Sequence, residues 1–197
     1  MGTEQNAEQL KILEYKERIH QLETCYKVTS LLNSELNQTV LLDTIMKIAR
    51  KVTKADASSL LLIDEEQGDL VFQVALSRVG EKIKELTRIK MGQGIAGTVA
   101  KTGRPLIIKD AYKSNKFDPS YDKKTGFKTG SILCAPLKSK DKIIGVCQVI
   151  HKQGKGKVFD REDLALFRLF CDSAALAIQN ARLHHILMEK QRLEKDM

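Results

Sequence analysis

The most informative segment of this chain, residues 122–152, combines two strand-forming runs with a polar loop that carries Thr125 and Thr129 and could close over a ligand. The runs SILCAPL and KIIGVCQVI are rich in β-branched and apolar residues, and KSKDK between them predicts an antiparallel hairpin. Since side chains alternate along a strand, Gln148 falls on the same face as Val146 and Ile150. A buried amide needs hydrogen-bond partners, and a bound polar molecule would supply them.

The common catalytic motifs are absent from the sequence: it has no nucleophile elbow, P-loop or HExxH motif. His184 and His185 are adjacent on an expected helix, so they face different directions and do not form an i, i+4 metal pair. His151 ends an expected strand without a cysteine partner placed for acid–base chemistry. The sequence therefore favours binding over catalysis, and we expect no catalytic residue and no metal site.

The four cysteines are scattered along the chain, without the close spacing of a zinc site or a disulfide framework. Cys134, Cys147 and Cys171 lie in apolar runs, where burial makes a thiol unreactive. We interpret them as buried thiols in a reducing compartment. The amino terminus is polar, and no apolar run approaches the length of a membrane span. We therefore expect a cytoplasmic protein without membrane contact.

A chain of 197 residues can bury one sizeable core with helical extensions left over, so we expect one domain. The fractions of hydrophobic (42%) and charged (29%) residues are ordinary for a soluble globular protein. The formal net charge is +8, but the lysines are spread out and are not interleaved with aromatic residues. Nucleic-acid binding is therefore disfavoured.

Residues 1–30 are predicted to form a helix with a short heptad seam, which favours a coiled-coil linker and a homodimer. The alternative is that this helix packs on its own domain. The seam positions are Ile12, Tyr15, Ile19, Leu22, Tyr26 and Thr29.

The middle of the chain alternates helical and strand-forming patterns. A helix is expected over residues 38–54, then a hairpin from ASSLLLID and DLVFQVAL, then a short helix in GIAGTVAKTG that ends at a glycine. Residues 109–128 form a long polar loop, and a loop of this length inside a compact domain usually has a function.

The last helix is expected to begin after Phe159, with Asp160 as its amino-terminal cap. It has one broad apolar stripe and a second stripe that contains Leu169, Leu176, Leu183 and Leu187. Its charged tail, residues 183–197, has no stop signal. The tail is therefore interpreted as a signalling helix that continues towards an effector, or as the place where a longer protein was cut.

Several consecutive blocks together resemble the GAF domain, over residues 31–182. The resemblance is to the branch found in cyclic-nucleotide phosphodiesterases and bacterial adenylate cyclases, and to bacterial GAF sensors. The matching blocks are SSLLLID (58–64), GQGIAGTVAKTG (92–103), IIKDAY (107–112), FDPSYDKKTGFKTGSILCAPL (117–137) and KIIGVCQVIHK (142–152).

The resemblance implies an α+β fold: a sheet of about six antiparallel strands, with long amino- and carboxy-terminal helices on one face and a ligand pocket on the other. A cyclic nucleotide, cAMP or cGMP, is the ligand that it suggests. In nucleotide-binding members the first strand, the short helix, the loop and the last hairpin line the pocket. By position these ligand-binding roles fall here on Ser59, Ile95, Ala96, Phe117, Asp122, Thr125, Thr129 and Gln148.

Some positions match the branch and others depart from it. The branch usually ends its last strand with Asn-Lys and follows it with Phe and then Asp-Glu, and its Lys and Asp form a structural salt bridge. Lys152 and Asp163 match, so the resemblance implies that bridge here. Phe159 also matches, whereas His151 stands in place of the asparagine and Leu164 in place of the glutamate.

The second strand also departs from the branch, because Ala75 and Leu76 occupy positions where an aromatic residue and an acid often meet the base. Our hypothesis is a dimeric regulatory sensor that binds a small molecule and signals through its end helices to an effector domain elsewhere in the parent protein. The alternative is a ligand-free GAF dimerisation and scaffold module. An enzyme of the free-methionine-sulfoxide reductase kind is disfavoured, because the loop lacks paired cysteines.

Overall fold

The structure is a computed structural model that describes residues 37–77, 88–154 and 158–195, with a few single positions and pairs before residue 31. The side chains at positions 38, 39, 121 and 125 lie outside this description. Most of the predicted seam in residues 1–30 also lies outside it. The described seam residues Ile12, Tyr15 and Ile19 are helical and exposed.

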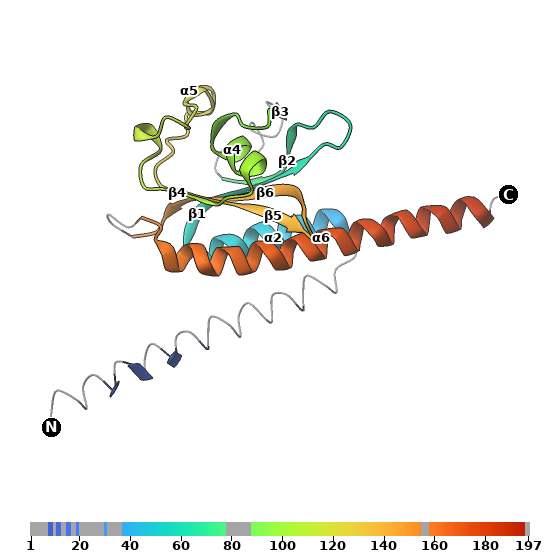
Figure 1. Cartoon of the computed structure of the whole chain (residues 1–197), viewed down its shortest axis with the longest axis horizontal. Helices are drawn as coiled ribbons and strands as arrows, with labels where there is room; N and C mark the ends of the chain where they lie inside the picture. The colour runs from blue at the N-terminus through green and yellow to red at the C-terminus, as the bar shows by residue number, and fades with distance from the viewer. Residues whose placement is uncertain are drawn as a thin grey trace.

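A six-stranded antiparallel sheet forms the centre of the described part, in the order β3-β2-β1-β6-β5-β4 (Figure 1). Its two long hairpins were expected from the sequence, and they pair through β1 and β6. The two shortest strands, β3 and β4, complete the edges. The strands are β1 (Ala55–Ile63), β2 (Leu70–Leu76), β3 (Arg88–Ile89), β4 (Leu106–Ile108), β5 (Ile132–Ser139) and β6 (Lys142–Lys152).

Two long helices, α2 (Gln38–Thr53) and α6 (Arg161–Lys195), cover one face of the sheet, and α6 continues well past its edge (Figure 1). Both begin at side-chain caps. Asn37 Oδ1 accepts a hydrogen bond from the N–H of Val40 at 3.2 Å. Asp160 Oδ1 accepts from the N–H groups of Glu162 and Asp163, each at 2.9 Å, so the predicted cap of the last helix is confirmed.

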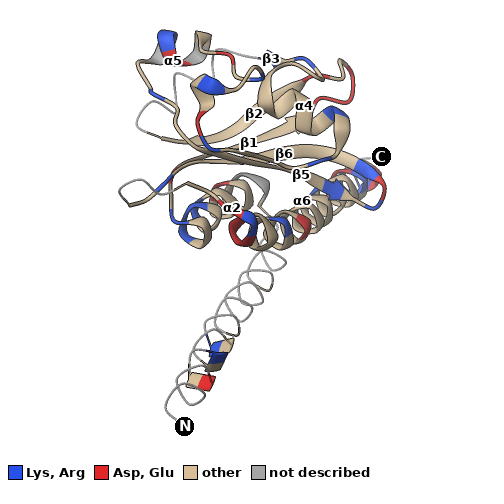
Figure 2. Cartoon of the chain, turned by 60° about the vertical axis from the view of Figure 1, so that its left-hand side comes forward, with Lys and Arg blue, Asp and Glu red and all other residues tan. Residues whose placement is uncertain are grey.

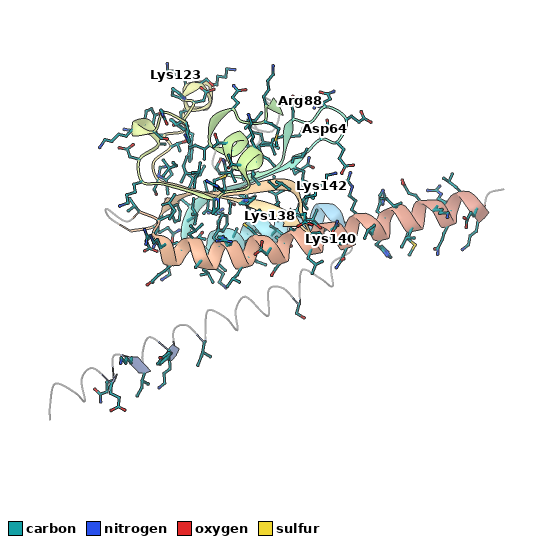
Figure 3. The ribbon with its side chains drawn as sticks, viewed as in Figure 1. Asp64, Arg88, Lys123, Lys138, Lys140 and Lys142 are labelled. Carbon is teal, nitrogen blue, oxygen red and sulfur yellow. The ribbon has the colours of Figure 1, made fainter. Side chains whose placement is uncertain are left out.

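The opposite face of the sheet carries shorter elements: α4 (Gly94–Thr102), the 3-10 helix η1 (Ala111–Lys113) and α5 (Ser120–Thr125). The edge strand β3 is tied to the β1–β2 turn by an ion pair between Arg88 Nη2 and Asp64 Oδ2 at 2.8 Å (Figure 3). Gly97 lets α4 lie against the preceding turn, because a Cβ there would stand 2.4 Å from the carbonyl oxygen of Lys90.

The apolar core is divided between the two faces. On the helix side, Leu60, Cys147 and Val149 pack with the apolar stripes of α2 and α6. On the other side, Val146 and Ile150 belong to the cluster under α4. The predicted alternation of side chains along β6 is therefore confirmed. The charged residues, in contrast, concentrate on the helices and loops around the sheet (Figure 2).

These features confirm the predicted α+β fold class, with an antiparallel sheet, long helices on one face and a pocket on the other. The three described cysteines are free and buried, and burial raises the pKa of the Cys134 thiol well above its ordinary value. In the described part of the chain, no helix combines the length and the apolar character that crossing a bilayer requires.

Candidate functional site

A cavity of about 130 Å³ lies on the sheet face opposite α2 and α6, beneath α4 and the segment that follows β4. This volume has room for several water molecules. Every predicted ligand-binding residue except Thr125 lines it. These residues are Ser59, Ile95, Ala96, Phe117, Asp122, Thr129 and Gln148. Thr125 belongs to α5, and its side chain lies outside the described part.

The amide of Gln148 lies at the floor of this pocket, in the middle of β6. Its neighbours in register are Ser59 on β1 and Cys134 on β5. Ser59 Oγ donates a hydrogen bond to Gln148 Oε1 at 3.3 Å. The polar side chain that looked anomalous in the sequence is therefore half of a cross-strand pair that borders the cavity.

The amino terminus of α4 also borders the pocket. The residue before the helix, Gln93, makes no side-chain capping bond, and Gly94, Ile95 and Ala96 form the first turn. The N–H groups of a first turn have no intrahelical acceptor, and the helix dipole makes this end partly positive. Backbone donors are thus available at the pocket wall for an anionic or carbonyl oxygen.

The side chain of Asp122 fastens the segment that covers the pocket, an arrangement that we call the Asp122 latch. Its Oδ2 accepts hydrogen bonds from Tyr112 Oη at 2.8 Å and from the N–H of Thr129 at 2.6 Å, and its Oδ1 accepts from Thr129 Oγ1 at 2.7 Å. The hydrogen bond to Asp122 raises the pKa of Tyr112. The latch therefore joins η1, α5 and the approach to β5.

The charged side chains among the described lining residues are both acidic, Asp118 and Asp122. The N–H of Ser120, 2.9 Å from Asp118 Oδ1, lowers the pKa of Asp118 and keeps it ionised. The lysine at position 123 of α5 points away from the sheet (Figure 3). A phosphate in this pocket would therefore depend on backbone N–H groups and hydroxyls for its hydrogen bonds.

Lys152 and Asp163 meet where β6 ends and α6 begins, as the sequence comparison with the branch implied. Lys152 Nζ lies 2.5 Å from Asp163 Oδ2 and 3.5 Å from Asp160 Oδ2. Burial alone would lower the pKa of Lys152, but the hydrogen bond and charge of Asp163, with the help of Asp160, raise it overall. The pair joins the strand that carries Gln148 to the first turn of α6.

His151, which replaces the asparagine of the branch, adopts a left-handed backbone conformation with φ 57°. Asparagine and histidine both tolerate this region better than β-branched residues do. The His151 ring packs edge-on against Phe127, with centroids 5.4 Å apart. The departure from the branch thus preserves the backbone requirement of the position.

Several lining residues were missed in the sequence, and for some of them a signal existed. Ile150 shares the face of Gln148, so strand alternation could have identified it, whereas Gln93 and Phe127 come from loops that alternation does not place. In β2, Ala75 lines the pocket and Leu76 packs on the helix-side core. Of these two positions, Ala75 lines this pocket and Leu76 does not.

An antiparallel sheet with helices on one face and a pocket on the other defines a class of small α+β domains. The match of residues 38–178 to the family described as GAF domain identifies the member of that class. The chain belongs to the GAF domain family, and the resemblance stated from its motifs is confirmed.

Two relatives illustrate where similar sequences occur. A probable 3',5'-cyclic phosphodiesterase, pde-5, of Caenorhabditis elegans is 35% identical over 148 residues, which are 71% of this chain and 20% of the relative. The cGMP-specific 3',5'-cyclic phosphodiesterase of Drosophila melanogaster is 35% identical over 170 residues, 81% of this chain and 15% of the relative. The chain thus spans a fifth or less of the length of these relatives.

Solved structures show the same fold at lower identity. The GAF domain of a phosphoenolpyruvate-protein phosphotransferase from Coxiella burnetii superposes with a TM-score of 0.74 at 20% identity, covering 85% of this chain and 98% of that one. Free methionine-R-sulfoxide reductase from Neisseria meningitidis, solved with its substrate, gives 0.69 at 16% identity, covering 83% and 91%. Both likenesses concern the fold.

Proposed function

We propose that this domain is a regulatory sensor, without catalytic activity of its own, that binds a cyclic nucleotide in the pocket beneath α4. The observation that carries the proposal is the convergence of Ser59, Gln148 and the first turn of α4 on one pocket. The 35% identity to cGMP-specific phosphodiesterases makes cGMP the first ligand to test and cAMP the second.

In the proposed complex the Ser59–Gln148 pair reads the edge of the base, because an amide offers both a donor and an acceptor. Phe117, which lines the same cavity, supplies an aromatic surface. The phosphate lies at the N–H groups of Gly94–Ala96. The two acidic lining residues disfavour ligands with more negative charge than a cyclic nucleotide.

Signalling requires the ligand to favour one arrangement of the domain over another. A nucleotide that fills the cavity presses on the segment that the Asp122 latch holds. It also contacts β6, whose end is joined to α6 through Lys152 and Asp163. We propose that these two connections carry occupancy of the pocket to α6.

The exposed stripe on α6 suits the proposed homodimer. Leu169, Leu176 and Leu183 recur every seventh residue, and each is about half exposed (51%, 50% and 55%). A seven-residue apolar repeat is the pattern of helices that pair along their length. We propose that residues 31–182 form the sensor, that the end helices dimerise, and that residues 183–197 lead to an effector in a longer cytoplasmic protein.

Calorimetric titration of the chain with cGMP and cAMP tests the proposal. Ser59→Ala should weaken binding by about tenfold, since it removes a hydrogen bond at the base site. Ser139→Ala is the matched control, because Ser139 Oγ donates to Gln179 Oε1 of α6 and Ser139 does not line the pocket. Absence of binding by either nucleotide at millimolar concentration would refute the nucleotide assignment.

The second candidate is a ligand-free dimerisation module. The observation in its favour is that polar groups of the pocket pair with one another: Ser59 with Gln148, and Thr129 with Asp122. Replacing Thr125 and Thr129 by valine distinguishes the two candidates. These changes should blunt regulation of the parent protein under the sensor proposal and leave it intact under the scaffold alternative.

A further inference from the structure

A stripe of leucines runs along the outward face of α6, on the side away from the sheet. Leu176 follows the buried Ala174 by two positions, and two residues turn an α-helix through about 200°. Leu183 is related in the same way to the buried Ala181. The side chains of this stripe therefore point away from the core of their own domain.

The stripe has the spacing of a coiled-coil seam. Its positions alternate steps of three and four residues, which is the heptad pattern in which the a and d positions face a second helix. Leu169, Leu176 and Leu183 take the d positions. We call the whole set the α6 seam: Leu166, Leu169, Ser173, Leu176, Asn180, Leu183 and Leu187.

The polar members of the α6 seam indicate that its partner is a second copy of α6. Ser173 Oγ donates to the carbonyl oxygen of Leu169 at 3.1 Å, so it is satisfied within its own helix. Asn180 is exposed and takes an a position. In a parallel pair in register each a position meets its own copy, so the two amides can hydrogen-bond to each other. In an antiparallel pair an a position meets a d position, and the amide would face a leucine without a partner.

The length of the α6 seam suits a weak but specific pair. Residues 166–187 span about 33 Å at the rise of an α-helix. Since α6 is already ordered against the sheet, pairing does not have to bear the cost of forming the helix. A single helix pair of this length is at the small end of specific interfaces, so a dissociation constant of about 1–100 μM is expected.

We infer that α6 pairs with α6 of a second copy in parallel and in register, and that contact between Asn180 and the partner's Asn180 fixes this arrangement. The arrangement rests on the homodimer of the proposed function, to which it adds an orientation. Because the pocket lies on the sheet face opposite α6, the two pockets lie on the outer sides of the pair. Since α6 continues past the edge of the sheet (Figure 1), residues 183–195 of both copies leave the pair side by side.

Sedimentation of the whole chain measures the pairing. Leu176→Glu should weaken dimerisation by about tenfold or more, because it places two like charges against each other at the centre of the α6 seam. Ile186→Glu is the matched control: Ile186 is 53% exposed but lies beside the seam, so dimerisation should be unchanged. A dimer that survives Leu176→Glu would overturn the proposal, since another surface would then hold the copies together.

Two cysteine variants measure the orientation. Ser173→Cys and Leu187→Cys each place a thiol at an a position, where it meets its own copy in a parallel pair in register. Under mild oxidation by glutathione disulfide both variants should form disulfide-linked dimers, with the unmodified chain as the control for its own cysteines. An antiparallel pair brings at most one of these positions to its twofold axis. Cross-linking of one variant alone, or of neither, would therefore overturn the parallel arrangement.

Asn180→Leu tests the residue that fixes the arrangement. It should strengthen dimerisation by about tenfold, because a polar seam residue specifies register at a cost in stability. It should also reduce cross-linking through Ser173→Cys, since antiparallel pairs then form as well. A weaker dimer or unchanged cross-linking would show that Asn180 does not set the orientation.

These experiments separate the orientation from the proposed function. A dimer whose cysteine variants do not cross-link removes the parallel arrangement and leaves the homodimer standing. A chain that stays monomeric at millimolar concentration removes both. Calorimetric titration of Leu176→Glu with cGMP tests the nucleotide pocket by itself, because Leu176 lies on the outward face of α6, away from the pocket.

Discussion

Leu60 and Cys147 on the helix-covered face of the sheet are fully buried among apolar side chains, whereas Ser59 and Gln148, their neighbours in the chain, border the pocket on the other face. The same two strands, β1 and β6, therefore serve both faces. Because side chains alternate along a strand, those on the helix-covered face can be apolar and pack in the core, while those on the other face can be polar and line the pocket. Stability and ligand recognition are thereby divided between adjacent residues.

The largest effect is expected on the helix face, from Phe167→Ala. Phe167 is fully buried in the core between α6 and the sheet, and truncating such a ring should cost about 3–5 kcal/mol of the free energy of unfolding. Phe117→Ala, on the pocket side, is the matched change. It should reduce stability less than Phe167→Ala does, and it should reduce ligand affinity more. Urea unfolding and calorimetry compare them, and equal losses of stability would contradict the division between faces.

The next effect concerns the Asp122 latch. Asp122→Asn replaces a carboxylate that accepts three hydrogen bonds with a neutral group that has one acceptor, so about 2 kcal/mol of stability should be lost. Because Asp122 raises the pKa of Tyr112, that pKa should fall towards its ordinary value in the variant. Ultraviolet titration of the phenol measures the shift, with Tyr112→Phe as the control for signal assignment. An unchanged titration would mean that the latch does not form in solution.

The third prediction concerns the Lys152–Asp163 ion pair, which joins the end of β6 to the first turn of α6. Lys152→Met should cost about 1–3 kcal/mol near neutral pH, because it removes a charged hydrogen bond to Asp163. The pKa of Lys152 is raised above its ordinary value on folding, so its contribution to stability is lost as pH rises through the folded-state pKa.

The difference in stability between the unmodified chain and Lys152→Met should therefore shrink as the pH rises through the folded-state pKa of Lys152. A double-mutant cycle with Asp163→Asn isolates the pair. A difference that does not vary with pH would show that the methionine acts through packing alone.

The strands, the helices and the strand face of Gln148 could be predicted from local patterns, whereas the layers and the other pocket residues were implied by the resemblance to the GAF domain. Alternation placed Gln148, and the motif blocks placed Ser59 and the first turn of α4. The Asp122 latch was not predicted as a latch, since its partners Tyr112 and Thr129 are joined by tertiary folding of a loop without periodicity.

The smallest effect is expected at His151, where the pocket side meets the end of β6. His151→Asn should leave stability within about 0.5 kcal/mol, because asparagine also accepts a left-handed backbone. His151→Val should cost about 1–2 kcal/mol, since a β-branched residue is strained at this φ. Thermal or urea unfolding of the two variants separates backbone from side-chain effects. If His151→Asn reduced stability as much as His151→Val, backbone conformation would not be the reason for histidine at this position. The edge-on contact between the His151 ring and Phe127 would then be the reason.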